Sequence, residues 1–278
     1  MRTLVHLSDL HFGRVDPALL APLVETVGAL APDVVVVSGD LTQRARRAQF
    51  IQAQAFLARL PGPQIVVPGN HDVPLYNVVD RLLRPLHKFR RYIEPSLNPS
   101  YLDDEIAVLG INTARALVLK NGRINAAQLE SLRAAWSEIG EEVVKVVVTH
   151  HPFDVPAHIG AAQRVGRAGM AMSLFAQHGA DVLLAGHLHA SRSGGTGERY
   201  ALGGYEALVV SAGTATSTRG RGEANSFNVL RLQKERVEVE RFEWLPDARR
   251  FAPTAGEVFE RRLRGWASAD AGPATPQA

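Results

Sequence analysis

The stretch VVPGNHD, residues 66–72, decides how the rest of the chain is interpreted. An apolar run with the composition of a buried strand ends directly in Gly69, Asn70, His71 and Asp72. Polar side chains are costly to bury without partners, so a strand that ends in them is a place where functional groups are often mounted. The pattern recurs in four further segments: TLVHLSDLH (3–11), DVVVVSGD (33–40), VVKVVVTHH (143–151) and DVLLAGHLH (181–189).

Helical segments lie between these strands. Residues 17–30 carry apolar side chains at helical spacing, and Pro17 suits a first turn. A helix between two apolar strands predicts a βαβ crossover, and therefore parallel strands. Further helices are expected at 42–60, at 125–139 and at 170–178. Asn125 and Gln128 form a capping pair for the second of these, and Gly179 ends the third.

The pattern changes after residue 185. Residues 205–216 and 227–244 have the composition and alternation of antiparallel strands, and residues 100–113 predict a hairpin that turns at two aspartates. Parallel and antiparallel strands together predict an α/β protein with mixed sheets. We expect a main domain over 1–250 and a C-terminal extension over 251–278. The last 12 or so residues, ASADAGPATPQA, have the composition of a disordered tail.

Composition limits the classes of protein and of site. The chain has 278 residues, of which 46% are hydrophobic, enough for a sizeable core. It contains no cysteine, which excludes cysteine-bound zinc and leaves His, Asp and Asn as metal ligands. The net charge of +3 is no strong signal for nucleic-acid binding. We expect neither a secretory signal nor a transmembrane segment, and hence a cytoplasmic location. No feature indicates an oligomeric state.

The polar strand ends are expected to meet. Ligands of open α/β sheets bind beyond the carboxyl ends of the strands, where so many Asp and His side chains need a positive partner. A pair of divalent ions would supply it, with a carboxylate such as Asp40 between them. Mixed nitrogen and oxygen ligands favour manganese or iron, with zinc as a further choice. The converging residues are Asp9, His11, Asp40, Asn70, His71, His150, His151, His187 and His189.

Five motifs in order carry a family resemblance. The motifs DLH (9–11), GD (39–40), GNHD (69–72), VVTHHP (147–152) and GHLH (186–189) resemble those of the calcineurin-like metallophosphoesterases. The residues of these motifs are similar to those of the bacterial cyclic-nucleotide phosphodiesterase branch, class III. The resemblance implies an α/β fold, a four-layer α/β/β/α sandwich with two mixed β-sheets. It also implies hydrolysis of phosphodiester bonds, in which a metal-bound hydroxide attacks, with cyclic nucleotides as one candidate substrate.

The resemblance also implies roles for individual residues. His71 would lie outside the metal shells as the catalytic acid, oriented by Asp72. One metal would be held by Asp9, His11 and His189, the other by Asn70, His150 and His187, and Asp40 would bridge them. His151 would be a residue beside the ligands or a substrate contact.

The segment after the third motif is expected to cover the site. Residues 73–100 would form an insertion that contacts a small anionic phosphodiester. Arginine clusters near the strand ends favour either ordinary solvated helix faces or a positive rim for the anion. The substrate-binding candidates are His151, Arg81, Arg84, Arg90 and Arg91.

Other functions remain open. Residues 39–45, GDLTQRA, and the GNHD motif depart from the pattern of protein Ser/Thr phosphatases. A nuclease of the same superfamily would need a larger DNA-binding surface. A nucleotide-sugar lipid pyrophosphatase would need an apolar cap, for which residues 73–93 are amphipathic enough. A non-catalytic scaffold would normally have lost metal ligands that this chain retains.

Overall fold

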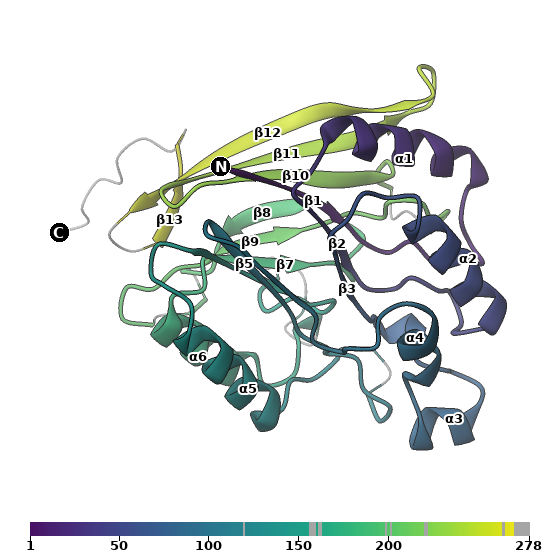
Figure 1. Ribbon diagram of the computed structural model, residues 1–278, viewed down its shortest axis with the longest axis horizontal. Helices are drawn as coiled ribbons and strands as arrows, with labels where there is room; N and C mark the ends of the chain where they lie inside the picture. Colours follow the sequence, from purple (N-terminus) through teal and green to yellow (C-terminus); the bar gives the residue numbers. More distant parts are fainter. Residues whose placement is uncertain are drawn as a thin grey trace.

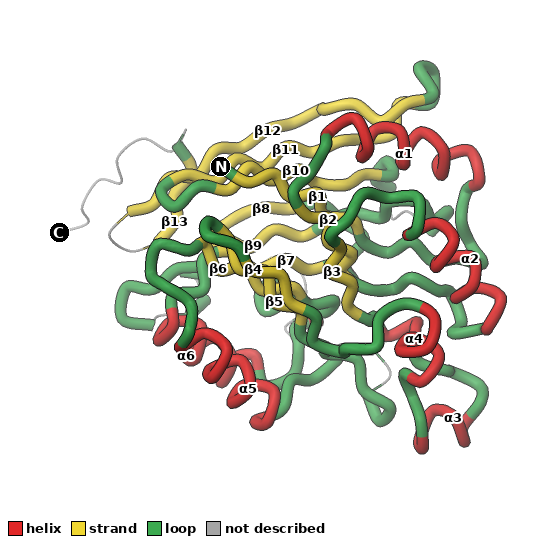
Figure 2. The backbone as a smooth tube through the Cα atoms, in the orientation of Figure 1, coloured by secondary structure: helices red, strands yellow, loops and turns green. Residues whose placement is uncertain are grey.

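Two mixed β-sheets pack face to face in the computed structural model, with helices on both outer sides (Figures 1 and 2). The structure describes residues 1–118, 120–155, 160, 163–197, 199–200, 202–219, 222–262 and 265–269. Within these ranges, no helix has both the length and the apolar composition needed to cross a membrane.

The first sheet has the strand order β13-β12-β11-β10-β1-β2-β3. Strands β1, β2 and β3 run parallel, as the crossover helices predicted, and the remaining neighbours are antiparallel. The strands are β1 (Arg2–Leu7), β2 (Val34–Ser38), β3 (Gln64–Val67), β10 (Ser226–Leu232), β11 (Arg236–Leu245), β12 (Arg250–Arg262) and β13 (Gly265–Ser268).

The second sheet has the strand order β4-β5-β6-β7-β9-β8. Its four inner strands are parallel, and one antiparallel strand lies at each edge. The strands are β4 (Ser100–Leu102), β5 (Ile106–Gly110), β6 (Val144–Val148), β7 (Val182–Ala185), β8 (Arg192–Gly195) and β9 (Leu208–Ser211).

Each strand face packs into a different layer of the core. In β2, Val34 and Val36 face the second sheet, whereas Val35 and Val37 face helices α1 (Pro17–Leu30) and α2 (Arg47–Leu57). The outer face of the second sheet packs against α5 (Ala126–Ser137) and α6 (Ala168–His178). Strands covered on both faces read as continuous valine runs for this reason. The four-layer α/β/β/α sandwich with two mixed sheets is confirmed.

Most helix ends follow the local sequence signals. Asn125 Oδ1 accepts the Gln128 N–H at 2.8 Å, and the Gln128 side chain accepts the Asn125 N–H at 3.1 Å. Gly179 ends α6 in the left-handed conformation that favours glycine. Helix α2 begins at Arg47 rather than Thr42, because the Thr42 N–H and hydroxyl both donate to Asp72 in a buried loop.

Two other expectations need correction. The segment 205–216 was expected to be antiparallel, but β9 pairs in parallel with β7 and antiparallel only with the edge strand β8. Residues 251–262 and 265–268, expected in the C-terminal extension, lie in β12 and β13 of the first sheet. The expected disordered tail begins inside β13, and its residues 270–278 lie outside the described ranges.

The expected insertion contains two short helices. Residues 73–100 connect the 3₁₀ turn η1 (Asn70–Asp72) to β4 and form α3 (Val78–Leu83) and α4 (His87–Tyr92). Figure 1 shows both helices at the carboxyl ends of the first sheet's parallel strands, at the lower right.

Candidate metal centre

Polar side chains from five parallel strands meet where the two sheets adjoin. Because β1–β3 and β6–β7 point their carboxyl ends to the same side, the residues that follow them converge. Asp9 and His11 follow β1, Asp40 follows β2, Asn70 follows β3, His150 follows β6, and His187 and His189 follow β7. All except the half-buried Asn70 are buried.

Asp9 lies at the centre of one group of side chains. Its Oδ1 is 3.4 Å from Nε2 of both His11 and His189. The two imidazole rings stack in parallel planes with their centroids 5.2 Å apart. A carboxylate oxygen and two ring nitrogens therefore converge from three sides, a donor set suited to a transition metal.

Asp40 lies between this group and a second one. Its Oδ2 is 3.4 Å from Nε2 of His150 and 3.7 Å from Nε2 of His11. On the far side, His150 Nε2 is 3.2 Å from Asn70 Oδ1. The candidate ligand atoms of Asp9, Asp40 and His150 lie within 4.8 Å of one another, so the two groups are contiguous. One carboxylate thus faces ligands of both groups.

Several of these buried atoms have no hydrogen-bond partner in the described residues. They are Asp9 Oδ1, both ring nitrogens of His11, and His187 Nε2. An unpaired buried polar atom costs about 1–3 kcal/mol, and here such atoms point into one space. Bound cations satisfy carboxylate and imidazole lone pairs together, so the residues present fit a metal centre.

The backbone of the cluster is held in an uncommon conformation. Five of its members adopt left-handed backbone angles, with φ between 50° and 71°: Asp9, His11, Asp40, His187 and His189. Non-glycine residues rarely adopt this region, and each one costs on the order of 1 kcal/mol or more. Such a conformation persists where surrounding contacts impose it. Here it directs the side chains of neighbouring residues toward the same space.

Glycines allow the strand ends to approach closely. A Cβ on Gly69 would lie 2.1 Å from Asp40 Oδ1, and one on Gly186 would lie 1.9 Å from Ser8 Oγ. Both contacts are far shorter than atoms tolerate. The glycine in GNHD and the glycine in GHLH are thus explained by the packing of neighbouring loops.

Hydrogen bonds orient the candidate ligands. His150 Nδ1–H donates to the Ser38 carbonyl at 2.8 Å, which leaves Nε2 for a metal. His189 Nδ1 lies 2.6 Å from Thr214 Oγ1, and Asp9 Oδ2 accepts the Ser8 hydroxyl at 2.6 Å. Each bond fixes one atom of the side chain and directs the other into the cluster.

Electrostatics favour ionised carboxylates beside the imidazoles. Burial opposes charge on His150, but the Asp40 carboxylate raises the pKa of this imidazole to about 9. Burial also opposes charge on Asp40, but His150 lowers the pKa of Asp40 well below its usual value. The buried Asp40 carboxylate thus calls for a positive partner, which a metal cation would supply.

Asp72 accepts hydrogen bonds from the loops that carry two candidate ligands. Its Oδ1 accepts the N–H and hydroxyl of Thr42, both at 2.9 Å, and its Oδ2 accepts the N–H of Gly69 at 2.9 Å and of Leu41 at 3.2 Å. Burial and the nearby Asp40 raise the pKa of Asp72 to about 6. The carboxylate therefore ties the β2 loop to η1, rather than orienting His71 as the sequence suggested.

His71 has other neighbours. Its Nδ1–H donates to the Gln43 carbonyl at 3.0 Å, and its Nε2 accepts from Arg219 Nη1 at 3.1 Å. Its ring meets that of His11 edge-on, with centroids 5.0 Å apart. Burial is the largest cause that lowers the pKa of His71, and Arg219 adds to it. The acceptor contact of Nε2 with Arg219 and the lowered pKa both favour the neutral imidazole, which lies beside the cluster.

Sequence reasoning missed Arg219. This residue lies in the loop after β9, and the parallel pairing of β9 with β7 brings that loop to the cluster. The Ala215 N–H donates to the Ser8 carbonyl at 3.1 Å and fixes the loop there. Residues 205–216 were interpreted as antiparallel strands, and the loop that follows them was given no place at the cluster. The arginines in STRGRG (217–222) were the available signal.

His151 is buried with both ring nitrogens bonded to the chain. Its Nε2–H donates to the Lys120 carbonyl at 2.8 Å, and its Nδ1 accepts from the Thr113 hydroxyl at 2.7 Å. Although His151 lies within ligand distance of His150 and His187, it has no free lone pair for a metal. The substrate contact expected for His151 stays a prediction.

The four candidate arginines of 73–100 lie in different places. Arg81 is buried, donates to the Pro74 carbonyl at 2.9 Å and lines a cavity of about 230 Å³ with Asn70 and His71. Arg84 pairs with Asp80 at 3.4 Å. The remaining contacts are those of Arg90 with the Pro95 carbonyl and of Arg91 with the Tyr92 ring. Arg81 alone of the four lines the cavity beside the cluster.

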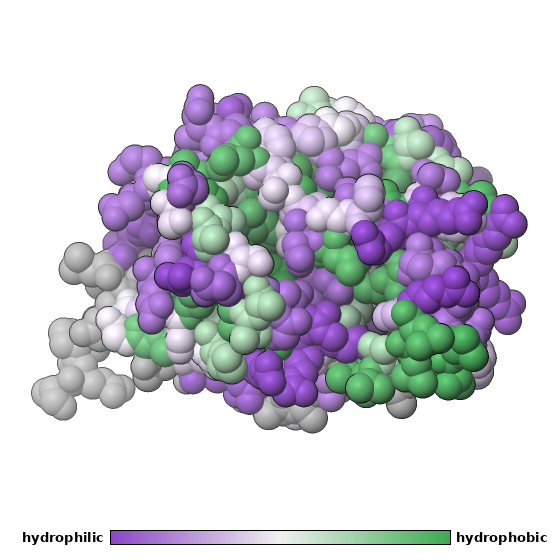
Figure 3. All heavy atoms as spheres, turned by 60° about the horizontal axis from the view of Figure 1, so that its bottom comes forward, coloured by the Kyte–Doolittle hydropathy of each residue, from purple (hydrophilic) through white to green (hydrophobic). Residues whose placement is uncertain are grey.

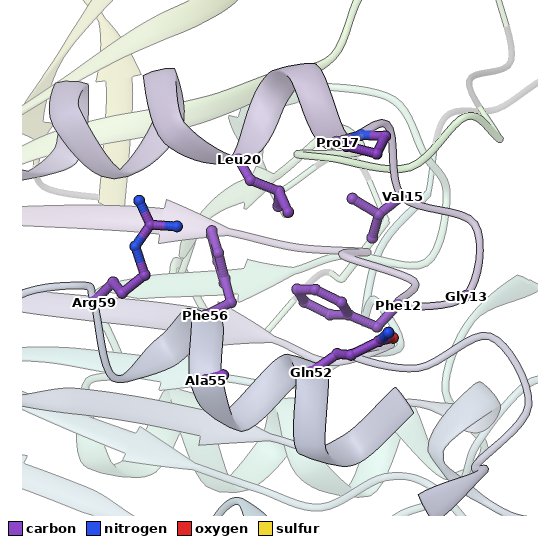
Figure 4. A pocket seen from close by; sticks show the side chains of 9 residues that line it. All are labelled: Phe12, Gly13, Val15, Pro17, Leu20, Gln52, Ala55, Phe56 and Arg59. Carbon is purple, nitrogen blue, oxygen red and sulfur yellow. The ribbon is translucent and has the colours of Figure 1, made fainter. Parts of the chain in front are cut away.

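A second hollow differs in chemistry. A groove of about 460 Å³ lies between α1 and α2, and Figure 4 shows Phe12, Val15, Leu20 and Phe56 facing one another across it. Arg59 is the titratable residue among those that line it. The apolar groove therefore has no groups for hydrolysis, whereas the cavity beside His71 does.

Known proteins share the motifs and the fold. The family model of the calcineurin-like phosphoesterases matches residues 2–191. The glycerophosphodiester phosphodiesterase GpdQ of Enterobacter lignolyticus is 31% identical over 173 residues, covering 58% of this chain. The chain spans 59% of that relative's length.

Solved structures show the same fold at low identity. Purple acid phosphatase PPD1 from yellow lupin has a TM-score of 0.72 at 13% identity, over 100% of this chain and 57% of that one. A dimetal phosphatase from Danio rerio has a TM-score of 0.61 at 13% identity, over 86% of this chain and 95% of that one.

Proposed function

Because the chain belongs to the calcineurin-like phosphoesterase family, we propose that it hydrolyses phosphodiesters with two divalent transition-metal ions. The observation that carries this proposal is the set of buried, unpaired ligand atoms that point into one space between the sheets. The proposed ligands are Asp9, His11 and His189 for one ion, Asn70, His150 and His187 for the other, and Asp40 for both.

The bound ions would activate a water molecule and neutralise phosphate oxygens. The chain itself positions the ligands: Asp40 Oδ1 also accepts the His71 N–H at 2.8 Å, so this carboxylate fixes η1 as well as the cluster. Manganese or iron suits the mixed imidazole and carboxylate set, and zinc is the third choice.

His71 and Arg219 form the proposed phosphate-binding side of the site. The guanidinium of Arg219 carries a permanent charge and can form two parallel hydrogen bonds to an anion. The Gln43 carbonyl fixes the His71 ring through Nδ1, which leaves Nε2 facing Arg219. We assign substrate binding to this pair. Proton donation by His71, expected from the sequence, is the competing role, and it would need a proton on Nε2.

The substrate class is a small anionic phosphodiester. The similarity to GpdQ adds glycerophosphodiesters to the cyclic nucleotides expected from the motif style. The cavity of about 230 Å³ beside His71 is lined by Arg44, Arg81 and Lys120 as well, which suits an anion. A scaffold role is disfavoured because the full ligand set converges. The cytoplasmic location stays a prediction.

Metal analysis joined to a substrate screen tests the proposal. We expect purified protein to hold up to two transition-metal ions per chain and to lose turnover of nitrophenyl, cyclic-nucleotide and glycerol diesters after chelation. Manganese, iron and zinc would then be added back separately. A His87→Ala variant, which changes an imidazole on α4, serves as the matched control and should keep both metals and activity. Full turnover by metal-free protein would refute the proposal.

A further inference from the structure

Helix α3 presents its apolar residues to solvent and its charged residues to the protein. Asp80 and Arg81 are buried, whereas Val79 is 62% exposed and Leu83 is 77% exposed. A helix on a protein surface normally has the opposite arrangement. The exposed apolar residues of this stretch, here called the α3 patch, are Leu75, Tyr76, Val78, Val79, Leu82 and Leu83.

The α3 patch is concentrated in one place. Figure 3 shows a hydrophobic area at the lower right, in the region that α3 occupies, surrounded by more polar surface. Single exposed apolar residues are common, but a contiguous group of them marks an interaction site.

Polar contacts underneath fix this orientation. Asn77 caps the helix through the Asp80 N–H at 3.0 Å, and Asp80 pairs with Arg84 at 3.4 Å and with Lys88 at 3.7 Å. Arg81 donates to the Pro74 carbonyl. Rotating the helix to bury its apolar face would break these contacts, so exposure of the patch is built into the segment.

Cations surround the α3 patch. Residues 73–93 contain five Lys or Arg and one Asp, and that Asp is buried. The Arg44 guanidinium lies 5.8 Å from the centroid of the Tyr76 ring, and Arg90 and Arg91 are exposed on α4. A symmetric dimer through the patch would bring the same cations of two copies together, which disfavours self-association.

We propose that the α3 patch docks on an anionic lipid surface. Apolar side chains flanked by Lys and Arg match the boundary between lipid acyl chains and negative headgroups, and tyrosine suits that boundary. Leu75 and Arg81 line the cavity that contains His71. Docking would therefore hold the entrance of that cavity close to the lipid.

Vesicle sedimentation with the full-length protein tests this inference. Two probes are compared at low ionic strength: vesicles of phosphatidylcholine, and vesicles of an equal mixture of phosphatidylcholine and phosphatidylglycerol. The test variant is Leu82→Gln/Leu83→Gln. The matched control is Leu102→Gln/Met170→Gln, which changes two exposed apolar residues on β4 and α6.

We expect the wild type to bind the anionic vesicles, to bind the neutral ones much more weakly and to lose binding as salt increases. Each leucine that inserts into the lipid contributes about a factor of ten to binding. The test variant, which loses two leucines, should therefore bind at least about tenfold more weakly. The control should bind like the wild type. Both variants should keep their metal content and their turnover of a nitrophenyl diester, which separates docking from hydrolysis.

Three results would overturn the proposal: no binding to anionic vesicles, equal weakening by the control pair, or equal binding to both vesicle types. Light scattering completes the experiment. If the wild type forms a dimer and Leu82→Gln/Leu83→Gln makes it dissociate, a second copy of the chain is the occupant of the α3 patch instead.

Discussion

Asp72→Ala should destabilise the fold more than it damages the chemistry. The substitution removes a carboxylate that accepts three backbone N–H groups and one hydroxyl. Each N–H left unpaired in the interior costs about 1–3 kcal/mol, and water entering the space left behind recovers part of this sum. We expect the free energy of unfolding to fall by about 3–5 kcal/mol, against a total of about 5–15 kcal/mol for a typical domain.

Urea unfolding followed by circular dichroism, with and without added metal, measures this loss. Asp33→Ala is the matched control, because the Asp33 carboxylate accepts one half-buried backbone N–H, that of Thr3 at 2.7 Å, away from the cluster. Its loss should be about 0.5–1.5 kcal/mol. Asp72→Ala could instead lower the free energy of unfolding by less than about 1 kcal/mol and still abolish turnover at full metal content. In that case Asp72 would act in catalysis, and its proposed role of joining the β2 loop to η1 would be wrong.

Four further predictions test the site. Asp40→Ala should remove both metals, since one carboxylate faces both groups, and retention of two tightly held ions on elemental analysis would exclude bridging. Arg219→Ala should lower kcat/KM for a diester by about 10–100-fold, as loss of a charged hydrogen bond does; Arg219→Lys should restore part of it, and an unchanged kcat/KM would exclude phosphate contact. His71→Ala should slow alkyl and nitrophenyl diesters equally if it binds phosphate, whereas selective slowing of the alkyl ester would make it the proton donor. Arg81→Gln should raise KM severalfold while Arg91→Gln leaves it unchanged, and equal effects in steady-state kinetics would contradict the cavity assignment.

The strands, the helices and the position of the cluster could be predicted because they depend on local signals, whereas the four layers came from the family resemblance. Apolar runs predicted buried strands, and the Asn125 cap predicted the start of α5. The parallel order of β1–β3 followed from the helices between them. Once the strands are parallel, the residues after them must lie at one edge of the sheets.

The features that the sequence did not predict are the partners of Asp72, the place of Arg219 and the start of α2. All three depend on contacts between distant segments. Asp72 is adjacent to His71 in sequence, but its hydrogen bonds go to loops at residues 41–42 and 69. Arg219 reaches the site only because β9 enters the second sheet beside β7. The helix expected from Thr42 starts later because Asp72 uses the Thr42 donors. No local pattern reports such partners.

Strand β1 is made before the other strands of its sheet, yet one of its two neighbours, β10, lies far along the sequence. Leu4 pairs with Val34 on one side and with Leu230 on the other. On a ribosome, β1 therefore has an open edge until β10 emerges, and closing so large a loop is a slow step of folding. Asp9 and His11 follow this same strand, so the cluster reaches its final arrangement only after β10 has been made. Metal uptake during synthesis would accordingly report the pairing of β1 with β10.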